Sequence, residues 1–293
     1  MVRQFLGALD PAEYLRNIGL EPYDWQQEAL DPSLRRLIML TARQSGKSTV
    51  VGGKALGKAK YVPGSLVLVI CPAQKQSKEL MKKIKILMAL DKELPELVRD
   101  STFEVEFTNG SRIIALPGSE RSVRSYSGPT MIIFDEAARV QDATYRAARP
   151  MMVGAPTELV LLSTPFGQRG FFWETWEKDN PRWKKILVVP AFQIRNHQIV
   201  PAPPLAQFRK QYQKEHSGVS VYYSTRHTQE FLEDELNDIR KGEFWVQQEY
   251  MCEFISAAGS LFDPADLLRA VKDNIEPLTG VKTRDDIEVL NII

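Results

Sequence analysis

The chain has 293 residues, a hydrophobic content of 43% and a formal net charge of +1 at pH 7. This composition supports a real buried core in one large domain or two small ones, and the charge balance by itself indicates no nucleic-acid partner. No apolar run is long enough to span a membrane, and the N-terminus lacks a signal-peptide core. We therefore expect a protein of the cytoplasm with no membrane contact.

Charged and metal-ligating residues are unevenly placed. Between Asp31 and Glu79 the chain has nine lysines and arginines and no acid, which gives this part a positive field suited to polyanions, unless these side chains only form solvated helix faces. Cys71 and Cys252 lie far apart in apolar settings and indicate buried thiols. The three histidines show no metal-ligand spacing.

The first elements in chain order are two short helices within residues 10–30, broken around Gly19–Pro22. Gln26 follows Tyr23 and Trp25 in this region. An amide can both donate to and accept from an adenine edge while an aromatic ring stacks on the base, so Gln26 is a candidate adenine reader. The alternative is an amphipathic helix with Trp25 in the core.

A phosphate-binding loop is predicted at Thr41–Ser48, between the apolar run Leu37–Leu40 and a helix over 47–61. Backbone N–H groups and the helix N-terminus would surround the phosphates. Lys47 would reach the β- and γ-phosphates, and the Ser48 hydroxyl would hold Mg²⁺. The usual first glycine of the motif is replaced by Thr41.

The next predicted elements are a buried strand at Gly64–Ile70, a helix at Ala73–Leu90 and a β-hairpin at Phe103–Phe107 and Arg112–Leu116, turning at Asn109-Gly110. The polar loop 118–128 follows and carries two candidate arginine fingers, which neutralise charge on a γ-phosphate in cis or from a neighbouring subunit. An ordinary solvated loop is the alternative. These candidates are Arg121 and Arg124, with Arg139, Arg146 and Arg149 as further ones.

Two later strands end in polar groups. Met131–Ala137 indicates a buried parallel strand with Asp135 and Glu136 at its carboxyl end, the edge where ligands bind in open α/β sheets. Asp135 would bind Mg²⁺ and Glu136 would orient the attacking water; the alternative is that these acids only begin a helix. Glu158–Pro165 predicts a second buried strand, whose terminal hydroxyls either sense the γ-phosphate or form a polar turn.

The rest of the chain completes an α/β fold. Helices over 142–152 and 171–176 and a strand over 183–189 predict a mostly parallel sheet with helices on both faces. Residues 193–204 are proline-rich and suggest a hinge, and 205–250 are helical in pattern. We expect a P-loop ATPase core at 1–195, a small helical lid at 196–255, and a linker with the start of a further region at 256–293.

Together these segments resemble the ATPase domain of the large terminase subunit, the DNA-packaging motor of tailed phages, over about residues 20–262. The segments that carry the resemblance are Trp25-Gln26, Thr41–Ser48, Ile132–Ala138, Ser163–Pro165 and Glu249–Phe254. It implies a P-loop NTPase fold of the ASCE type. Lys47-Ser48 matches the Walker A pair, Asp135-Glu136 the Walker B pair, and Ser163-Thr164 the coupling motif. Gln26 matches the adenine-motif residue, and Arg124 the trans-acting arginine, with Arg121 as the other choice.

The resemblance implies an Mg²⁺-dependent ATPase that drives double-stranded DNA into a procapsid in the host cytoplasm. Partners would be the DNA, further copies in a ring on a portal, and the small terminase subunit. No nuclease activity is expected, because the pattern of the family's nuclease domain is missing after Gly280-Val281. A two-domain helicase and a nucleotide-binding scaffold without motor action are the alternatives. The implied nucleotide-binding set is Gln26, Arg43, Gln44, Ser45, Gly46, Lys47, Ser48, Thr49, Asp135, Ser163 and Thr164.

Overall fold

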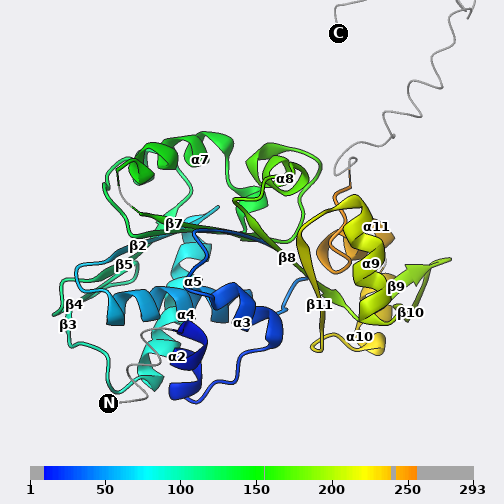
Figure 1. The fold of residues 1–293 in the computed structure, drawn as a ribbon, viewed down its shortest axis with the longest axis horizontal. Helices are drawn as coiled ribbons and strands as arrows, with labels where there is room; N and C mark the ends of the chain where they lie inside the picture. Colours follow the sequence, from blue (N-terminus) through cyan, green and yellow to red (C-terminus); the bar gives the residue numbers. More distant parts are fainter. Residues whose placement is uncertain (1–9, 155, 239–241, 256–293) are drawn as a thin grey trace, which may run out of the picture. The chain divides into compact units, whose positions relative to one another are not determined.

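A nine-stranded sheet crosses the part of the chain that the computed structural model describes, residues 10–154, 156–238 and 242–255 (Figure 1). Neighbouring strands from β11 to β5 run parallel, and β4 and β3 continue the sheet antiparallel. The predicted mostly parallel sheet is confirmed. In spatial order its strands are β11 (Val219–Ser224), β8 (Lys184–Pro190), β1 (Arg36–Thr41), β7 (Glu158–Ser163), β6 (Met131–Asp135), β2 (Leu66–Cys71), β5 (Arg112–Pro117), β4 (Glu104–Phe107) and β3 (Leu97–Asp100).

Helices cover both faces of this sheet (Figure 1). On one face lie α2 (Pro11–Asn17), α3 (Asp24–Leu30), α4 (Lys47–Tyr61) and α5 (Gln74–Leu90), and on the other α7 (Asp142–Ala148) and α8 (Gly170–Glu177). The shorter connections are α6 (Glu120–Val123) and the 3-10 turns η1 (Ala137–Arg139) and η2 (Arg149–Met152). Helix α9 (Leu205–Glu215) lies in the connection from β8 to β11, and α10 (Gln229–Asn237) and α11 (Gly242–Glu249) follow β11. No helix in these described ranges is long and apolar enough to cross a membrane.

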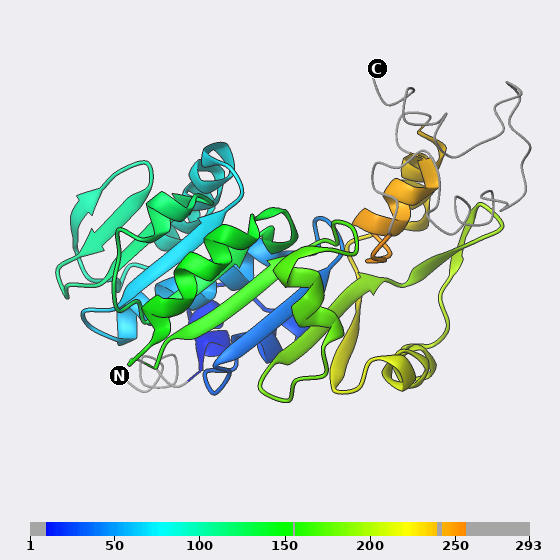
Figure 2. The same cartoon turned by 90° about the horizontal axis from the view of Figure 1, so that it is seen from above.

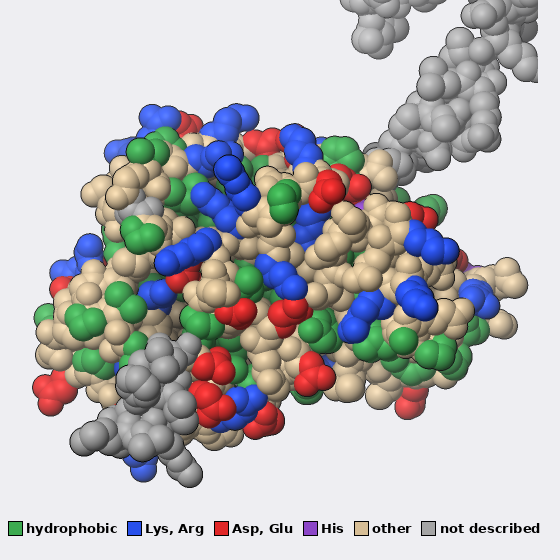
Figure 3. Space-filling view, viewed as in Figure 1, with side chains coloured by type: hydrophobic (Ala, Val, Ile, Leu, Met, Phe, Trp, Pro, Cys, Tyr) green, Lys and Arg blue, Asp and Glu red, His purple; other side chains and the backbone are tan. Residues whose placement is uncertain are grey.

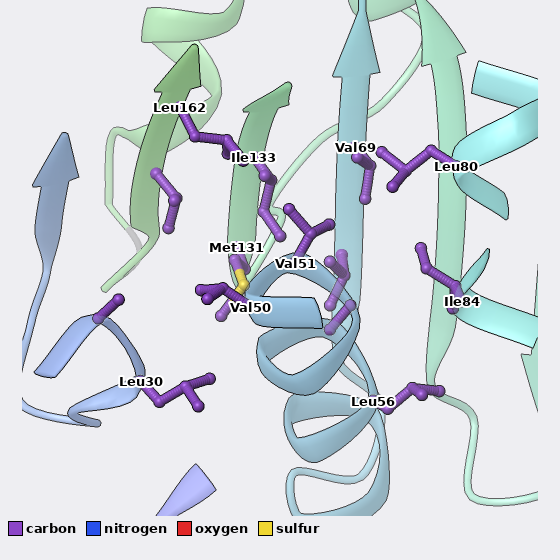
Figure 4. Close-up of a cluster of buried hydrophobic side chains, with 14 of the residues drawn as sticks. Leu30, Val50, Val51, Leu56, Val69, Leu80, Ile84, Met131, Ile133 and Leu162 are labelled. Atoms are coloured by element: carbon purple, nitrogen blue, oxygen red, sulfur yellow. The ribbon is translucent and has the colours of Figure 1, made fainter. Parts of the chain in front are cut away.

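The central strands read as continuous apolar runs because both of their faces are buried. In β1, Leu37 and Met39 belong to the core under α2–α5, while Ile38 and Leu40 belong to the core under α7 and α8. Figure 4 shows the first core, where valines of α4 meet side chains of β2, β6 and α5. These buried strands hold the loops at their carboxyl ends in place.

Two adjacent glycines in α4 allow its close packing. A Cβ on Gly52 would lie 2.2 Å from Cδ1 of Leu87 in α5, and one on Gly53 would lie 3.1 Å from Cδ2 of Leu15 in α2. Glycine weakens a helix interior by roughly 1 kcal/mol relative to alanine. Here the absence of a side chain lets the helix after the phosphate-binding loop approach both of its neighbours.

The structure differs from the predicted elements after residue 190. The expected hinge contains a hairpin of β9 (Phe192–Arg195) and β10 (Gln198–Pro201), which extends away from the sheet (Figure 2). The prediction of helix throughout 205–250 was wrong at β11, which pairs parallel with β8. The division at residue 195 stays a prediction, and the expected linker and tail at 256–293 lie outside the described residues.

Candidate nucleotide site

The loop between β1 and α4 has the geometry of a phosphate-binding loop. Strand β1 ends at Thr41, one residue beyond the predicted apolar run, and α4 begins at Lys47, as predicted. The loop turns through two left-handed residues, Gln44 with φ +61° and Gly46 with φ +107°. A Cβ on Gly46 would lie 2.9 Å from Nε2 of Gln26, so a side chain there would displace the Gln26 amide as well as strain the backbone.

The ends of three parallel strands bring the catalytic candidates together. Strand β6 ends at Asp135, and β7 ends at Ser163 between β6 and β1. Nζ of Lys47 lies 3.8 Å from Oε1 of Glu136. The Ser163 hydroxyl donates to Oε2 of Glu136 over 3.4 Å. The motifs that the sequence spreads over more than a hundred residues therefore meet at one edge of the sheet, as an open α/β fold requires.

Glu136 has a left-handed backbone, with φ +50° and ψ +45°. This conformation is uncommon for a residue with a side chain and costs on the order of 1 kcal/mol or more. It forms the sharp turn from β6 into η1, which aims Glu136 toward Lys47.

Burial shapes the electrostatics around Asp135. Desolvation and the neighbouring Glu136 raise the pKa of this carboxyl, while Lys47 and Lys83 oppose the rise. Lys83 comes from α5 and donates to the Ser48 hydroxyl over 3.2 Å. The positive charge of Lys83, beside the Ser48 hydroxyl and the buried Asp135, favours the ionised form of the Asp135 carboxyl. The contact of Lys83 with Ser48 joins residues 35 positions apart and has no local sequence signal.

A pocket of about 880 Å³ opens over these groups. The lining residues come from the phosphate-binding loop, from the end of β6 and its following turn (Asp135 and Glu136), from α5, and from the segment with Arg226, His227 and Phe231. Eight of the predicted site residues line it: Arg43, Gln44, Gly46, Lys47, Ser48, Thr49, Asp135 and Glu136. The volume is in the range of small-molecule sites.

Gln26 lies against the phosphate-binding loop with both ends of its amide engaged. Nε2 donates to the Gly46 carbonyl over 3.2 Å, and Oε1 accepts from the Tyr23 amide over 3.0 Å. Gln26 is buried, at 2% exposure, together with Trp25. Its position beside the loop agrees with a place in the site, and its role as an adenine reader stays a prediction.

His227, one of the three histidines without metal-ligand spacing, lines the pocket. Its Nε2 lies 2.7 Å from the Arg43 carbonyl oxygen, which only accepts, so Nε2 carries the proton. Nδ1 is then an acceptor; it is buried and has no hydrogen-bond partner among the described residues. Burial lowers the pKa of His227 and outweighs the hydrogen bond to the Arg43 carbonyl, which raises it; Arg226 and Lys47 lower it further. The imidazole is therefore neutral at pH 7.

A buried carboxylate on α11 connects the loop with the coupling motif, and no sequence pattern predicted this contact. Oε2 of Glu249 accepts from the Thr164 hydroxyl over 3.2 Å and lies 3.8 Å from Nη1 of Arg43. Oε1 accepts from Nη2 of Arg139. Arg139 also donates to Glu136 over 3.3 Å and to Thr164 over 2.9 Å. Arg139 is thus engaged within its own chain.

The proposed arginine fingers do not line the pocket over the phosphate-binding loop. Arg124 forms an ion pair with Glu120 and, with Arg146 and Tyr126, lines a separate hollow of about 560 Å³. Arg121 is exposed on α6. A finger role for either arginine would therefore have to be played at a neighbouring subunit or after a rearrangement, and it stays a prediction.

The sheet order, the loop on β1 and the carboxylates on β6 define the class of P-loop α/β proteins. More narrowly, the chain belongs to the family described as terminase large subunit, T4likevirus-type, N-terminal, whose profile matches residues 38–269. No curated protein sequence matches the chain.

Solved structures of phage terminases share this fold. The ATPase domain of the Thermus phage P74-26 large terminase aligns with a TM-score of 0.60 at 16% identity, over 84% of this chain and 100% of that one. The large terminase of bacteriophage HK97 aligns with a TM-score of 0.58 at 14% identity, over 80% of this chain and 51% of that one. The large terminase of a thermophilic bacteriophage in complex with ATP-gamma-S aligns with a TM-score of 0.51 at 11% identity, over 80% and 53%. The chain spans about half the length of the latter two proteins.

Proposed function

We propose that this chain is the ATP-hydrolysing motor domain that drives double-stranded DNA into a phage procapsid in the host cytoplasm. The contact of Lys47 with Glu136 carries the proposal, because it joins a phosphate-binding cation to the carboxylate that would activate water. Membership in the terminase family supports the packaging role. By the same reasoning the motor would assemble as a ring on a portal and work with a small subunit.

The residues present fit ATP and Mg²⁺. The Ser48 hydroxyl and the Asp135 carboxylate are the hard oxygen donors that Mg²⁺ prefers, and this ion usually takes its remaining ligands from water and phosphate. The Ser45 hydroxyl, inside the loop, is buried and has no hydrogen-bond partner within the described part of the chain. A phosphate in the loop would supply one. The thermophilic bacteriophage terminase, a relative in fold, has been solved with ATP-gamma-S.

Each side chain then has a defined task. Lys47 would leave Glu136 for the β- and γ-phosphates and neutralise their charge. Glu136 would accept a proton from the attacking water, and Ser163 and Thr164 would respond to the state of the γ-phosphate. Mg²⁺, when bound, adds charge neutralisation at the phosphates. An arginine from a neighbouring subunit would complete it, with an effect on the order of 10³–10⁵ in rate.

The test is Glu136→Gln. We expect turnover to fall by at least about 10²-fold, because an amide cannot accept the proton, whereas the affinity for ATP should stay within about threefold. ATP hydrolysis with and without double-stranded DNA and binding of a fluorescent ATP analogue measure the two effects. Glu215→Gln, an exposed glutamate at the end of α9, is the matched control. A Glu136→Gln protein that keeps most of its turnover would refute the role of this residue, and wild-type protein that neither binds nor hydrolyses ATP would refute the proposed function.

A further inference from the structure

Glu249 is a buried carboxylate whose charge is balanced by groups from three separate parts of the site. Its side chain is 5% exposed. Arg43 of the phosphate-binding loop approaches one carboxylate oxygen, and Arg139, three residues after Glu136, donates to the other. The Thr164 hydroxyl adds a hydrogen bond. A buried charge is stable only while it is paired and hydrogen-bonded. If Glu249 loses one of its partners, its interaction with the remaining partners must therefore become stronger.

Arg139 is shared between two carboxylates. Its Nη1 donates to Glu136 and its Nη2 donates to Glu249. The guanidinium also lies over the Phe166 ring, 4.8 Å from its centroid, and its Nη1 donates to the Thr164 hydroxyl as well. A stronger attraction of Arg139 to Glu249 therefore weakens the hydrogen bond between Arg139 and Glu136. The presence or absence of a second cation beside Glu249 therefore determines how strongly Arg139 binds Glu136.

The other cation on Glu249 faces the nucleotide pocket. The side chain of Arg43 is 54% exposed and lines the pocket over the loop. A bound triphosphate would attract this guanidinium far more strongly than a single carboxylate 3.8 Å away. Glu249 itself cannot follow, because the Glu249 carbonyl accepts from the Arg43 amide over 2.8 Å and fixes the end of α11 to the loop backbone.

We infer that Arg43, Glu249 and Arg139 form a charge relay that reports nucleotide arrival to Glu136, an inference that rests on the ATPase function proposed above. When phosphate takes Arg43 from Glu249, Glu249 draws Arg139 to itself. Lys47 leaves Glu136 for the same phosphates. Glu136 is then released from two cations at once and becomes available to the water. Glu249 and Arg139 are positioning residues in this scheme, since neither contacts the reacting atoms.

The decisive variants are Glu249→Gln and the double variant Glu249→Gln with Arg139→Gln. Glutamine keeps the size of Glu249 and a hydrogen bond to Thr164 but removes the charge that draws Arg139 away. We expect kcat to fall at least about tenfold while the Kd of a fluorescent ATP analogue stays within about threefold. Removing Arg139 as well should then release Glu136 and restore kcat to at least about a third of the wild-type value. Because removing both members of a buried ion pair also relieves structural damage, thermal unfolding of each variant measures that damage separately from kcat.

Controls separate this inference from the proposed function. Glu243→Gln lies on the same helix, where Glu243 pairs with His197, and it should leave kcat and Kd unchanged. Arg139→Gln alone should retain at least about half of the wild-type kcat, which provides a test even if Glu249→Gln fails to fold. The relay is overturned if wild-type protein hydrolyses ATP but Glu249→Gln behaves like Glu243→Gln, if the double variant is no faster than Glu249→Gln, or if Arg139→Gln alone abolishes turnover. Absence of ATP binding and turnover in the wild type would instead overturn the proposed function.

Discussion

At the scale of single residues, the site is built from side chains that already have partners within the chain. Gln26 uses both ends of its amide, on the Gly46 carbonyl and the Tyr23 amide, and the P-loop glycine has no room for a Cβ against it. Gln26 therefore stabilises the conformation of the phosphate-binding loop through a hydrogen bond to the loop backbone. This supporting contact is distinct from the base-reading role expected from the sequence, and the two roles predict different results.

The substitution Gln26→Glu separates the two roles. It places a carboxylate oxygen where Nε2 now donates to the Gly46 carbonyl, and two acceptors at 3.2 Å repel. We expect the affinities for ATP and GTP to fall together, by about tenfold, because the loop and not the base contact is disturbed. Titration of the protein with each nucleotide measures this. A loss confined to ATP would support adenine reading by Gln26 instead.

At the residue scale, the sequence supports a prediction only where the chemistry is contiguous. The run Gly46-Lys47-Ser48 and the pair Asp135-Glu136 are recognisable because backbone geometry fixes neighbours in the chain. The Arg139–Glu249 contact joins residues 110 positions apart, and Lys83 reaches Ser48 across 35. Such pairs depend on how α5 and α11 pack, for which a single sequence has no local sign.

At the scale of elements, the parallel strands were predictable and the edges were not. Strands buried on both faces are apolar along most of their length, so β1, β2, β6 and β7 stand out. Strand β11 lies at the edge of the sheet, and its burial alternates as Val219 and Val221 point inward between half-buried residues. Its serines and tyrosines lie within a polar stretch, and the pattern of that stretch led to the prediction of a helix. The four residues of β3 are all exposed and gave no apolar pattern.

Helix α4 carries a buried lysine whose charge opposes folding. Lys54 is 2% exposed, and desolvation lowers its pKa to about 8 despite attraction from Glu158. Below pH 8 the folded state must hold a buried ammonium, so the penalty is fully present at pH 7. The penalty fades as the pH rises from about 8 toward the ordinary lysine value, because the folded state is then neutral while the unfolded chain gives up its proton.

Lys54→Met should therefore stabilise the protein at pH 7, by on the order of 2 kcal/mol, and the gain should shrink between pH 8 and pH 10. Thermal or urea unfolding across this range measures both features. Lys58→Met is the comparison with opposite sign, because Nζ of Lys58 lies 2.6 Å from Oε1 of Glu158, which is 3% exposed. Losing that partner should cost about 3 kcal/mol. Destabilisation by Lys54→Met would show that this ammonium is well paired in the folded state.

At the scale of the whole molecule, positive charge gathers on one face. Figure 3 shows lysine and arginine side chains over the part of the surface that α7 occupies in Figure 1. The exposed arginines of α6, α7 and the segments that directly follow them are Arg121, Arg124, Arg146 and Arg149. In residues 119–149 Glu120 is the only exposed acid. Such a face suits a phosphate backbone bound without regard to sequence.

The double substitution Arg146→Ala with Arg149→Ala tests this face. We expect the affinity for double-stranded DNA to fall about tenfold at moderate salt and the slope of log affinity against log salt to decrease by about 1–2, as for the loss of one or two phosphate contacts. Fluorescence anisotropy at several salt concentrations measures both. Lys210→Ala with Lys214→Ala removes the same charge from exposed positions on α9 and should leave DNA binding nearly unchanged. Equal losses in the two double variants would point to net charge alone.

Assembly is the remaining question at this scale, because Arg124 lies away from the pocket of its own chain. If it completes a neighbouring site, a subunit with Arg124→Ala and one with Glu136→Gln have complementary defects. Where they adjoin, an intact Glu136 meets an intact Arg124, so the mixture should hydrolyse ATP several times faster than either variant alone, and its rate per subunit should rise with protein concentration. Steady-state turnover of mixtures at fixed total protein measures this, with Arg121→Ala mixed in the same way to distinguish the two candidate arginines. A mixture no faster than the mean of its components would mean that Arg124 does not act in trans.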